Sequence, residues 1–283
     1  MAADPTTGPG PGRPRLADPG ADDLGTPVAL PARVHRVVSL VPSLTEAVAA
    51  TGPDLLVGAT DWCHHPADLD VPRVGGTKWP RLDDVTALAP DLVLANAEEN
   101  RLEDVAALRE RGTAVWVTGP VDVPTALASL RRALAACGLD RPGWLAEAER
   151  VWAAPAPATR RRALVPVWRR PWMAVGAGTF TGDVLARLGV DNVLASGAER
   201  YPRVDPAALR GDGALPPYDL VVLPDEPYLF TADDGPEAFP DVPAALVSGR
   251  HLTWYGPSLV EARDLLTAQL AAALPPHRER QPG

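Results

Sequence analysis

The chain has 283 residues, of which 46% are hydrophobic and 22% charged, and its formal net charge is -9 at pH 7. These proportions are typical of a globular protein and exclude disorder except locally. Because the charge is acidic and no basic patch or basic helix is present, we expect neither nucleic acid nor an anionic membrane as a partner. No stretch approaches the roughly 20 apolar residues of a membrane helix, so we also expect no membrane insertion.

Residues 1–33 are rich in Pro, Gly, Ala and Asp, which predicts a disordered arm. The arm contains no apolar segment of the kind found in secretion signals and no cysteine that could carry a lipid. We therefore expect a cytoplasmic protein. Its two cysteines, Cys63 and Cys137, lie in different predicted elements and do not form a disulfide framework.

The chain contains two versions of one α/β pattern, which indicates an internal duplication. Each version has a strand, a helix that opens with hydroxyl or acidic residues, a second strand, a Pro-Arg-Val loop and a buried strand. Corresponding landmarks lie about 130 residues apart, too far for a solenoid repeat. The paired segments are Val37–Val41 and Ala163–Trp168, Ser43–Glu46 and Thr179–Asp183, Leu55–Ala59 and Asn192–Leu194, Pro72–Val74 and Pro202–Val204, and Asp91–Leu94 and Asp219–Leu223.

A helical connector separates the two versions. Asp122 is a plausible N-cap, Pro124 falls in the first turn, and the helix runs through Cys137 until Gly138 ends it. A second amphipathic helix begins near Pro142. The sequence thus predicts an α/β fold with two Rossmann-like lobes joined by a central backbone helix. The expected divisions are an arm at 1–33, an N-terminal lobe at 34–120, a connector at 121–157, a C-terminal lobe at 158–276 and a tail at 277–283.

Polar side chains follow the predicted strands at the edge where α/β proteins place ligands. Ser43 comes directly after the first strand and, with Glu46, fits a capping box. Glu98 belongs to a polar cluster that follows the Asp91 strand, and its alternative role is a solvated helix start. Glu226 and Tyr228 follow the corresponding strand of the second version. Ser43, Glu98, Glu226 and Tyr228 are candidate ligand contacts.

The stretch Asp61–Pro66 has the highest concentration of reactive side chains. Asp61, Cys63 and His64 could hold a transition metal such as zinc, copper or cobalt, although adjacent ligands on one loop rarely all face one ion. A loop that presents Trp62, Cys63 and His64 to a cleft is the preferred interpretation.

Aromatic residues occur in three further loops, and in two of them a cationic residue lies close by in the sequence. Lys78, the single lysine of the chain, precedes Trp79 in a Gly-rich loop, where a compact ammonium and a flat ring could meet a ligand. In the second version, Arg169 and Trp172 lie where the first version has its strand-to-helix corner at Ser43. A loop near the C-terminus carries Trp254 and Tyr255 directly before Gly256-Pro257, and we expect residues of such a loop not to be buried in the core.

Four segments resemble the helical-backbone metal receptor family, the class III substrate-binding proteins of ABC importers for cobalamin, haem and ferric siderophores. They are Val37–Gly52, Asp61–Pro80, Ala89–Asn96 and Leu252–Ser258. The cobalamin-binding branch is the most similar, through Ser39–Glu46 and Pro90–Val93.

The resemblance implies one ligand clamped between two lobes with little hinge motion. It also implies that five aromatic residues lie near ligand-facing loops: Trp62, Trp79, Trp172, Tyr228 and Trp254. Family members are exported and dock their permease through an acidic residue on each lobe. Asp83 or Asp84 would serve in the first lobe, and the matching stretch Val204–Arg210 offers Asp205.

We therefore predict a monomeric binding protein, not an enzyme, that has no cofactor of its own and holds a corrinoid or similar metal chelate. Lys78, Arg169 and Glu226 would orient its polar substituents. One alternative is direct binding of a transition metal by Asp61, Cys63 and His64. Another is a hydrolase with Ser43 or Cys63 as nucleophile, for which the sequence shows no complete set of partners.

Overall fold

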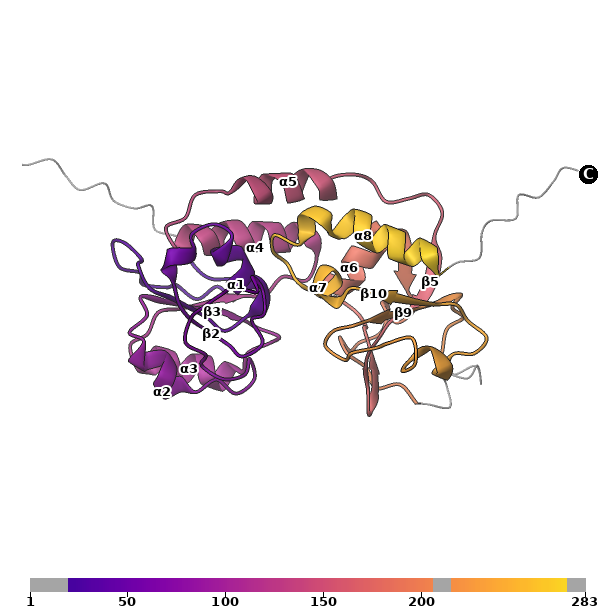
Figure 1. Cartoon of the computed structure of the whole chain (residues 1–283), viewed down its shortest axis with the longest axis horizontal. Helices are drawn as coiled ribbons and strands as arrows, with labels where there is room; N and C mark the ends of the chain where they lie inside the picture. The colour runs from indigo at the N-terminus through magenta and orange to yellow at the C-terminus, as the bar shows by residue number, and fades with distance from the viewer. Residues whose placement is uncertain (1–19, 206–214, 274–283) are drawn as a thin grey trace, which may run out of the picture.

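The computed structural model describes residues 20–205 and 215–273. Two α/β lobes lie side by side, and helices cross from one to the other along a single face of the molecule (Figure 1). This arrangement confirms the predicted fold class. Within the described residues, no helix is both long enough and apolar enough to span a membrane.

The N-terminal lobe is built on a four-stranded parallel sheet in the order β2-β1-β3-β4. The central strands are short runs of Val and Leu whose residues are all buried, as expected for a sheet covered on both faces. The strands are β1 Val37–Ser39, β2 Leu56–Ala59, β3 Leu92–Asn96 and β4 Val115–Thr118. The helices are α1 Pro42–Ala49, α2 Leu82–Ala87 and α3 Leu102–Glu110, with a 3-10 turn, η1, at Pro53–Leu55.

The C-terminal lobe repeats this sheet. Its order is β10-β9-β5-β8, all parallel, so β5, β8, β9 and β10 take the places of β1, β2, β3 and β4. The strands are β5 Arg161–Leu164, β8 Val190–Asn192, β9 Leu220–Pro224 and β10 Ala244–Val247. The helices are α6 Phe180–Arg187, α7 Gly249–Thr253 and α8 Leu259–Ala272, with the 3-10 turn η3 at Pro236–Ala238. The shared strand order is what an internal duplication predicts.

The two lobes differ where the sequence predicted one strand over Ala163–Trp168. The chain instead leaves the sheet after Leu164 and forms an antiparallel hairpin of β6 Pro166–Arg169 and β7 Trp172–Ala174. Apolar residues continue from β5 into β6, so the hydrophobic pattern alone does not show where the chain leaves the sheet.

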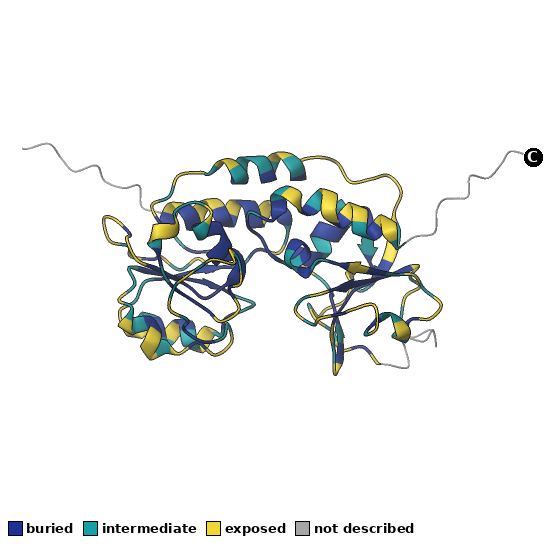
Figure 2. Cartoon of the chain, viewed as in Figure 1, coloured by how far each residue is buried: buried dark blue, intermediate teal, exposed yellow. Residues whose placement is uncertain are grey.

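The connector consists of α4 Val123–Ala136 and α5 Gly143–Trp152. Asp122 caps α4 as predicted, accepting a hydrogen bond from the backbone N–H of Thr125 at 2.7 Å. Because α4 packs against both α1 and α6, one continuous core joins the lobes, with its buried positions on the inner helix faces (Figure 2). On the outside, α5 packs against α8, and the Trp152 indole N–H donates to the Leu259 carbonyl at 2.8 Å.

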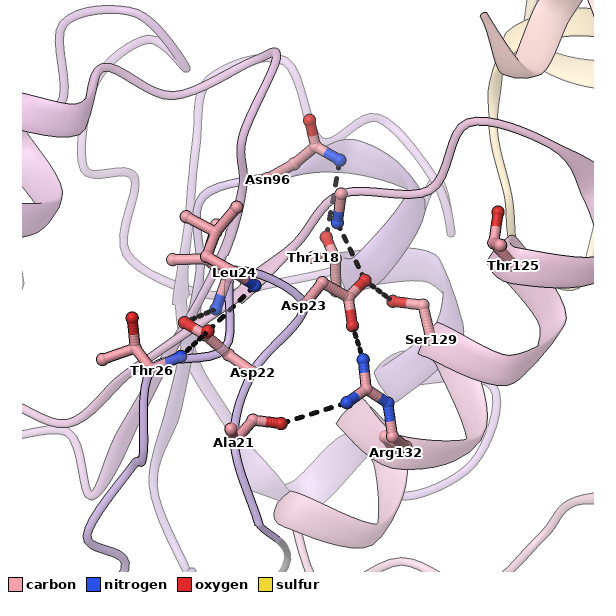
Figure 3. Close-up of polar contacts among 12 residues, drawn as sticks. Ala21, Asp22, Asp23, Leu24, Thr26, Asn96, Thr118, Thr125, Ser129 and Arg132 are labelled. Atoms are coloured by element: carbon pink, nitrogen blue, oxygen red, sulfur yellow. Dashed lines mark hydrogen bonds and ion pairs between the residues drawn. The ribbon is translucent and has the colours of Figure 1, made fainter. Parts of the chain in front are cut away.

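The segment before the first strand lies against the N-terminal lobe (Figure 3). Asp23 accepts hydrogen bonds from the Gly119 N–H at 2.9 Å and the Ser129 hydroxyl at 2.5 Å, and forms an ion pair with Arg132. Asp22 is buried and pairs with Arg109 at 2.8 Å. The predicted disorder is therefore wrong for residues 20–33. Residues 1–19 and 274–283, with the predicted tail, lie outside the described residues.

The predicted capping box at the start of α1 is also wrong. The helix begins at Pro42 with Val41 as its N-cap, and no side chain caps it. Glu46 turns instead to Arg250 of the C-terminal lobe, with which it forms an ion pair. Glu46 is thus bonded to a side chain 204 residues away in the sequence and not to the backbone at the start of its own helix.

Candidate ligand-binding site between the lobes

The loops that follow the strands of one lobe meet those of the other. Tyr201, in the loop after β8, donates a hydrogen bond from its hydroxyl to Glu98 Oε2 at 3.0 Å. Arg200 forms an ion pair with the same carboxylate. The Lys78 ammonium donates to the Glu98 carbonyl oxygen, so the two predicted residues lie together in one polar cluster.

Buried asparagines hold the Glu98 loop in place. Asn96 Oδ1 accepts the backbone N–H groups of Glu98 at 2.7 Å and Glu99 at 3.1 Å. Asn100 Nδ2 donates to the Thr77 carbonyl at 2.9 Å, which ties this loop to the Gly-rich loop carrying Lys78. The loop after β3 is therefore fixed from both ends, as a preorganised binding surface requires.

Glu99 and Glu226 bring two carboxyl groups from opposite lobes to this boundary. The pKa of Glu99 is raised to about 7, mainly by burial and further by the charges of Glu98 and Glu226, with Lys78 acting in the opposite direction. Burial also raises the pKa of Glu226, with Asp225 adding to the effect. The Trp254 indole N–H donates to Glu226 Oε2 at 3.1 Å.

Glycines permit the close approaches that build the C-terminal side of the site. A Cβ on Gly249 would lie 2.6 Å from Glu226 Cβ, so the first residue of α7 must be small for the Glu226 loop to pass. A Cβ on Gly176 would overlap the Glu199 carbonyl oxygen, next to Arg200. Both glycines thus position residues that face the other lobe.

Tyr255 and Trp254 are buried, contrary to the prediction that they are poor core candidates. Tyr255 is 4% exposed, and its hydroxyl lies 2.6 Å from Asn96 Nδ2 and 2.7 Å from Thr118 Oγ1. Burial raises the pKa of this phenol. Trp254 packs edge-on against His65 with ring centroids 5.5 Å apart. Both residues join the two lobes, and Ser43 is buried beside them.

The loop Asp61–Pro66 does not form the predicted metal site. Cys63 is buried, with its sulfur 3.0 Å from the Thr45 hydroxyl and 3.1 Å from that of Thr60, whereas Asp61 and His64 are exposed. Across residues 20–205 and 215–273, no group of three or more His, Cys, Asp or Glu side chains is arranged to hold a metal ion. Within these described ranges, the structure thus does not bring Asp61, Cys63 and His64 together as ligands of one metal ion.

Cys63 is also a poor nucleophile. Burial raises its pKa, and no histidine is hydrogen-bonded to Cys63 or Ser43 in the part of the chain that the structure describes. The hydrolase alternative gains no support from the geometry.

The aromatic residues that the resemblance places near ligand-facing loops differ in how far they are exposed. Trp62 and Trp79 are 61% and 70% exposed, and the Arg101 guanidinium lies 4.0 Å from the centroid of the Trp79 ring. Trp172 is only 8% exposed and stacks on Phe230 in the core of the C-terminal lobe. The Trp172 ring therefore packs on Phe230 and is not available to a ligand.

Arg169 and Tyr228 likewise have partners within their own lobe. Arg169 forms ion pairs with Asp234 and Glu237, and the Tyr228 hydroxyl donates to Asp234 Oδ2 at 2.6 Å. Neither is free to orient a ligand in this conformation.

Sequence reasoning missed Arg200, Tyr201, Glu99 and Arg250. The duplication offered a signal for the first two. They lie before the Pro202–Val204 loop, just as the Asp61–Pro66 loop lies before the Pro72–Val74 loop of the first version.

A cavity of about 330 Å³ opens where α1 and α7 meet, and both lobes contribute to its wall. Its lining residues are Glu46, Ala49, Ala50, His65, Pro66 and Arg250. The cavity is adjacent to Trp254, through His65, and so to the Glu226 loop.

Comparison with known proteins supports the two-lobe fold. No family model matches the chain. A segment of 91 residues is 30% identical to the vitamin B12-binding protein of Vibrio cholerae serotype O1; it covers 31% of this chain and 33% of the relative, so the match spans about a third of the relative's length.

Solved structures match over most of the chain. The periplasmic vitamin B12-binding protein of Vibrio cholerae is 17% identical, with a TM-score of 0.64 over 85% of this chain and 98% of that one. The apo haem-binding protein RhuT of Roseiflexus sp. RS-1 is 19% identical, with a TM-score of 0.68 over 84% and 98%. CeuE of Helicobacter pylori, in a nickel–histidine complex, is 13% identical, with a TM-score of 0.73 over 89% and 88%.

The chain thus has the two-lobe fold of the class III periplasmic binding proteins. The resemblance to the helical-backbone metal receptor family is confirmed at the level of this fold. The structural neighbours are binding proteins for vitamin B12, haem and metal chelates.

Proposed function

We propose that this chain is a non-enzymatic binding protein that holds a metal chelate, first of all a corrinoid such as cobalamin, between its two lobes. The observation that carries the proposal is the meeting of the post-strand loops at the lobe boundary, where Tyr201 contacts Glu98. Ligands of open α/β sheets bind outside the carboxyl ends of the strands. The partial sequence match to a vitamin B12-binding protein favours a corrinoid among the chelates.

The side chains at the boundary suit a flat ligand with polar substituents. Trp62 and Trp79 are 61% and 70% exposed, so part of each large ring is available to contact a flat ligand. Lys78, Glu98 and Glu226 supply a few polar groups close to them, as expected for a pocket that gains affinity from apolar contact and orientation from polar contact.

We further propose delivery of the ligand to an ABC permease. Asp83 is the better docking candidate on the N-terminal lobe, since its side chain is 92% exposed. Asp205 is its proposed counterpart, at the edge of a stretch whose residues 206–210 lie outside the described residues. The monomeric state stays a prediction. Delivery to the permease of an importer needs a protein outside the cytoplasm, so it is an alternative to the cytoplasmic location that the sequence predicts.

Titration of the purified full chain tests the ligand class. Cyanocobalamin, haemin and a ferric tricatecholate are added separately while tryptophan emission and the visible band of the ligand are followed, with N-acetyltryptophanamide correcting for light absorbed by the ligand. We expect saturable one-to-one quenching by cyanocobalamin. Absence of a saturable response to all three would overturn the proposal.

Two tryptophan variants locate the binding surface. Because Trp79 is exposed, Trp79→Ala is expected to weaken cyanocobalamin binding about tenfold while changing the free energy of unfolding by less than about 0.5 kcal/mol. Trp144 on α5, whose indole N–H donates to Thr51 at 3.1 Å, provides the matched control. Trp144→Ala should lower stability and leave affinity unchanged; the reverse pattern would exclude Trp79 from the site.

A further inference from the structure

The Gly-rich loop of the N-terminal lobe folds back on itself and carries Trp79. Gly75 and Pro80 form an antiparallel bridge, so the chain reverses direction between them. Gly75 has a φ of 93°, and a Cβ on it would lie 3.1 Å from the Trp79 carbonyl oxygen, so the reversal favours a glycine at this position. The backbone that carries Trp79 is therefore a tight and constrained turn.

This turn adjoins the boundary between the lobes. The Lys78 ammonium donates to the Glu98 carbonyl oxygen, and the Glu98 carboxylate accepts a hydrogen bond from Tyr201 of the C-terminal lobe at 3.0 Å. Trp79 directly follows Lys78 in the chain and contacts Arg101, which comes three residues after Glu98. The turn thus lies along the loop after β3, next to the proposed ligand site.

A cation covers one face of the Trp79 ring. The Arg101 guanidinium lies over the ring at 4.0 Å from its centroid, which is within the range of a cation–π interaction. Trp79 is nevertheless 70% exposed. With one face covered, an exposed fraction this large requires that the opposite face be open to solvent. A ligand can therefore reach the ring from the side away from Arg101.

Two carboxylates hold the guanidinium over the ring. Arg101 Nε lies 3.6 Å from Glu103 Oε2 and 3.8 Å from Asp104 Oδ2. Arg101 is the N-cap of α3, and both acids belong to the first turn of that helix. The Asp104 side chain is only 16% exposed, so it is a fixed part of the lobe surface. The position of Arg101 is thus determined by α3.

The arrangement orders a large ring without burying it. A cation–π contact at an exposed site is weaker than the full burial of a tryptophan ring, so a stable fold alone does not explain why Trp79 is held in solvent. A side chain that is already ordered loses less conformational entropy when a flat ligand stacks on it. An ordered, exposed ring beside a binding site therefore favours a role in binding.

We infer that Arg101 is a positioning residue of the ligand site, which fixes the Trp79 ring as a platform whose face opposite Arg101 receives a flat chelate. The inference rests on the proposed function, because it assigns how one wall of that site meets its ligand. Its direct consequence is that Arg101 contributes to affinity through Trp79 and not through a contact of its own.

A double-mutant cycle with cyanocobalamin tests this dependence. Arg101→Gln removes the guanidinium and should weaken binding about three- to fivefold, the ratio expected for an exposed cation–π contact. In the Trp79→Ala background, the same substitution should leave the affinity unchanged, because no ring remains to be positioned. Equal weakening in both backgrounds, or no weakening in the background with Trp79, would overturn the inference.

Arg111→Gln is the matched control. Arg111 is at the opposite end of α3, its side chain is 41% exposed, and it pairs with Asp83 at 2.7 Å. No cation–π contact involves it in the part of the chain that the structure describes. This variant should bind cyanocobalamin as tightly as wild type, and a loss equal to that of Arg101→Gln would overturn the inference.

A measurement without ligand separates this inference from the proposed function. The full chain is labelled with 5-fluorotryptophan, and the fluorine resonance of Trp79 is assigned by its loss in Trp79→Phe. Arg101→Gln should move this resonance toward that of free 5-fluorotryptophan, whereas Arg111→Gln should leave it in place. That result supports the positioning role even if no corrinoid binds. An unchanged Trp79 resonance in Arg101→Gln overturns the inference and leaves the proposed function untouched.

Discussion

The carboxyl group of Glu99 links the environment at the lobe boundary to stability. Its pKa is about 7 in the folded protein because burial and the neighbouring Glu98 and Glu226 disfavour the charged form, and 4.5 is the ordinary value. Between these two values the folded state holds a proton that the unfolded state has lost. The free energy of unfolding therefore falls as pH rises from about 4.5 to about 7, and the loss is complete above pH 7.

We predict that Glu99→Gln removes this slope. The variant should match wild type at pH 4.5 and be more stable at pH 8 by about 1–3 kcal/mol, since each unit of pKa shift corresponds to about 1.4 kcal/mol. Urea denaturation at a series of pH values gives the comparison. Glu103→Gln, at a side chain that is 75% exposed, is the control and should keep the wild-type slope. An unchanged slope in Glu99→Gln would contradict the assignment.

The position of a side chain at the lobe boundary was predicted best where the sequence places a polar residue directly after a strand. Glu98 and Glu226 lie there because parallel strands bring their carboxyl ends to one edge. Their contact with a ligand stays a prediction. The buried state of Trp172 and Tyr255 was not predicted, since their partners Phe230, Asn96 and Thr118 are distant in the sequence. Residue type and loop position alone do not show tertiary burial.

At the scale of the element, the segment at residues 20–33 stabilises the junction between β4 and α4 (Figure 3). Asp22 accepts hydrogen bonds from the backbone N–H of Leu24 at 3.0 Å and of Thr26 at 2.9 Å, as well as pairing with Arg109. Asp23 accepts hydrogen bonds from Gly119 and Ser129, which lie before and after the first residue of α4. Removal of a buried carboxylate here leaves a guanidinium and several donors unpaired.

We therefore expect Asp22→Ala to lower the free energy of unfolding by about 2–4 kcal/mol. Urea denaturation at pH 7 measures the change, and Asp68→Ala, at an exposed loop position, should alter it by less than about 0.5 kcal/mol. Equal, small effects of both substitutions would show that the segment contributes little to stability.

The elements themselves were largely predictable, since helix limits follow local signals. Asp122 as N-cap and Gly138 after the helix predicted α4, and Thr179 caps α6 from the predicted position. The internal duplication explains why the two sheets share one strand order. The docking of residues 20–33 was not predictable, because a Pro- and Gly-rich composition does not show that Asp22 and Asp23 meet Arg109 and Arg132.

At the scale of the whole molecule, the lobes are joined through two sets of contacts. The helical face is continuous, since α4 packs on a helix of each lobe, and Tyr255 and Arg250 extend the junction with buried contacts. Beside this junction, where Asn96 bonds to both Tyr255 and the Glu98 backbone, Glu98 meets Arg200 and Tyr201 at a more exposed position. A shared core favours small relative motion, so a ligand would enter by displacing the exposed contacts.

The position of cobalt in a crystal of the full chain grown with cyanocobalamin tests the central claim most directly. An anomalous difference map recorded at the cobalt edge locates the metal without reference to the ligand model. We predict one peak between the lobes, bordered by the loops carrying Lys78–Trp79, Glu98–Glu99 and Glu226. A peak on the outer surface of one lobe, or none from protein saturated with cyanocobalamin, would contradict the account.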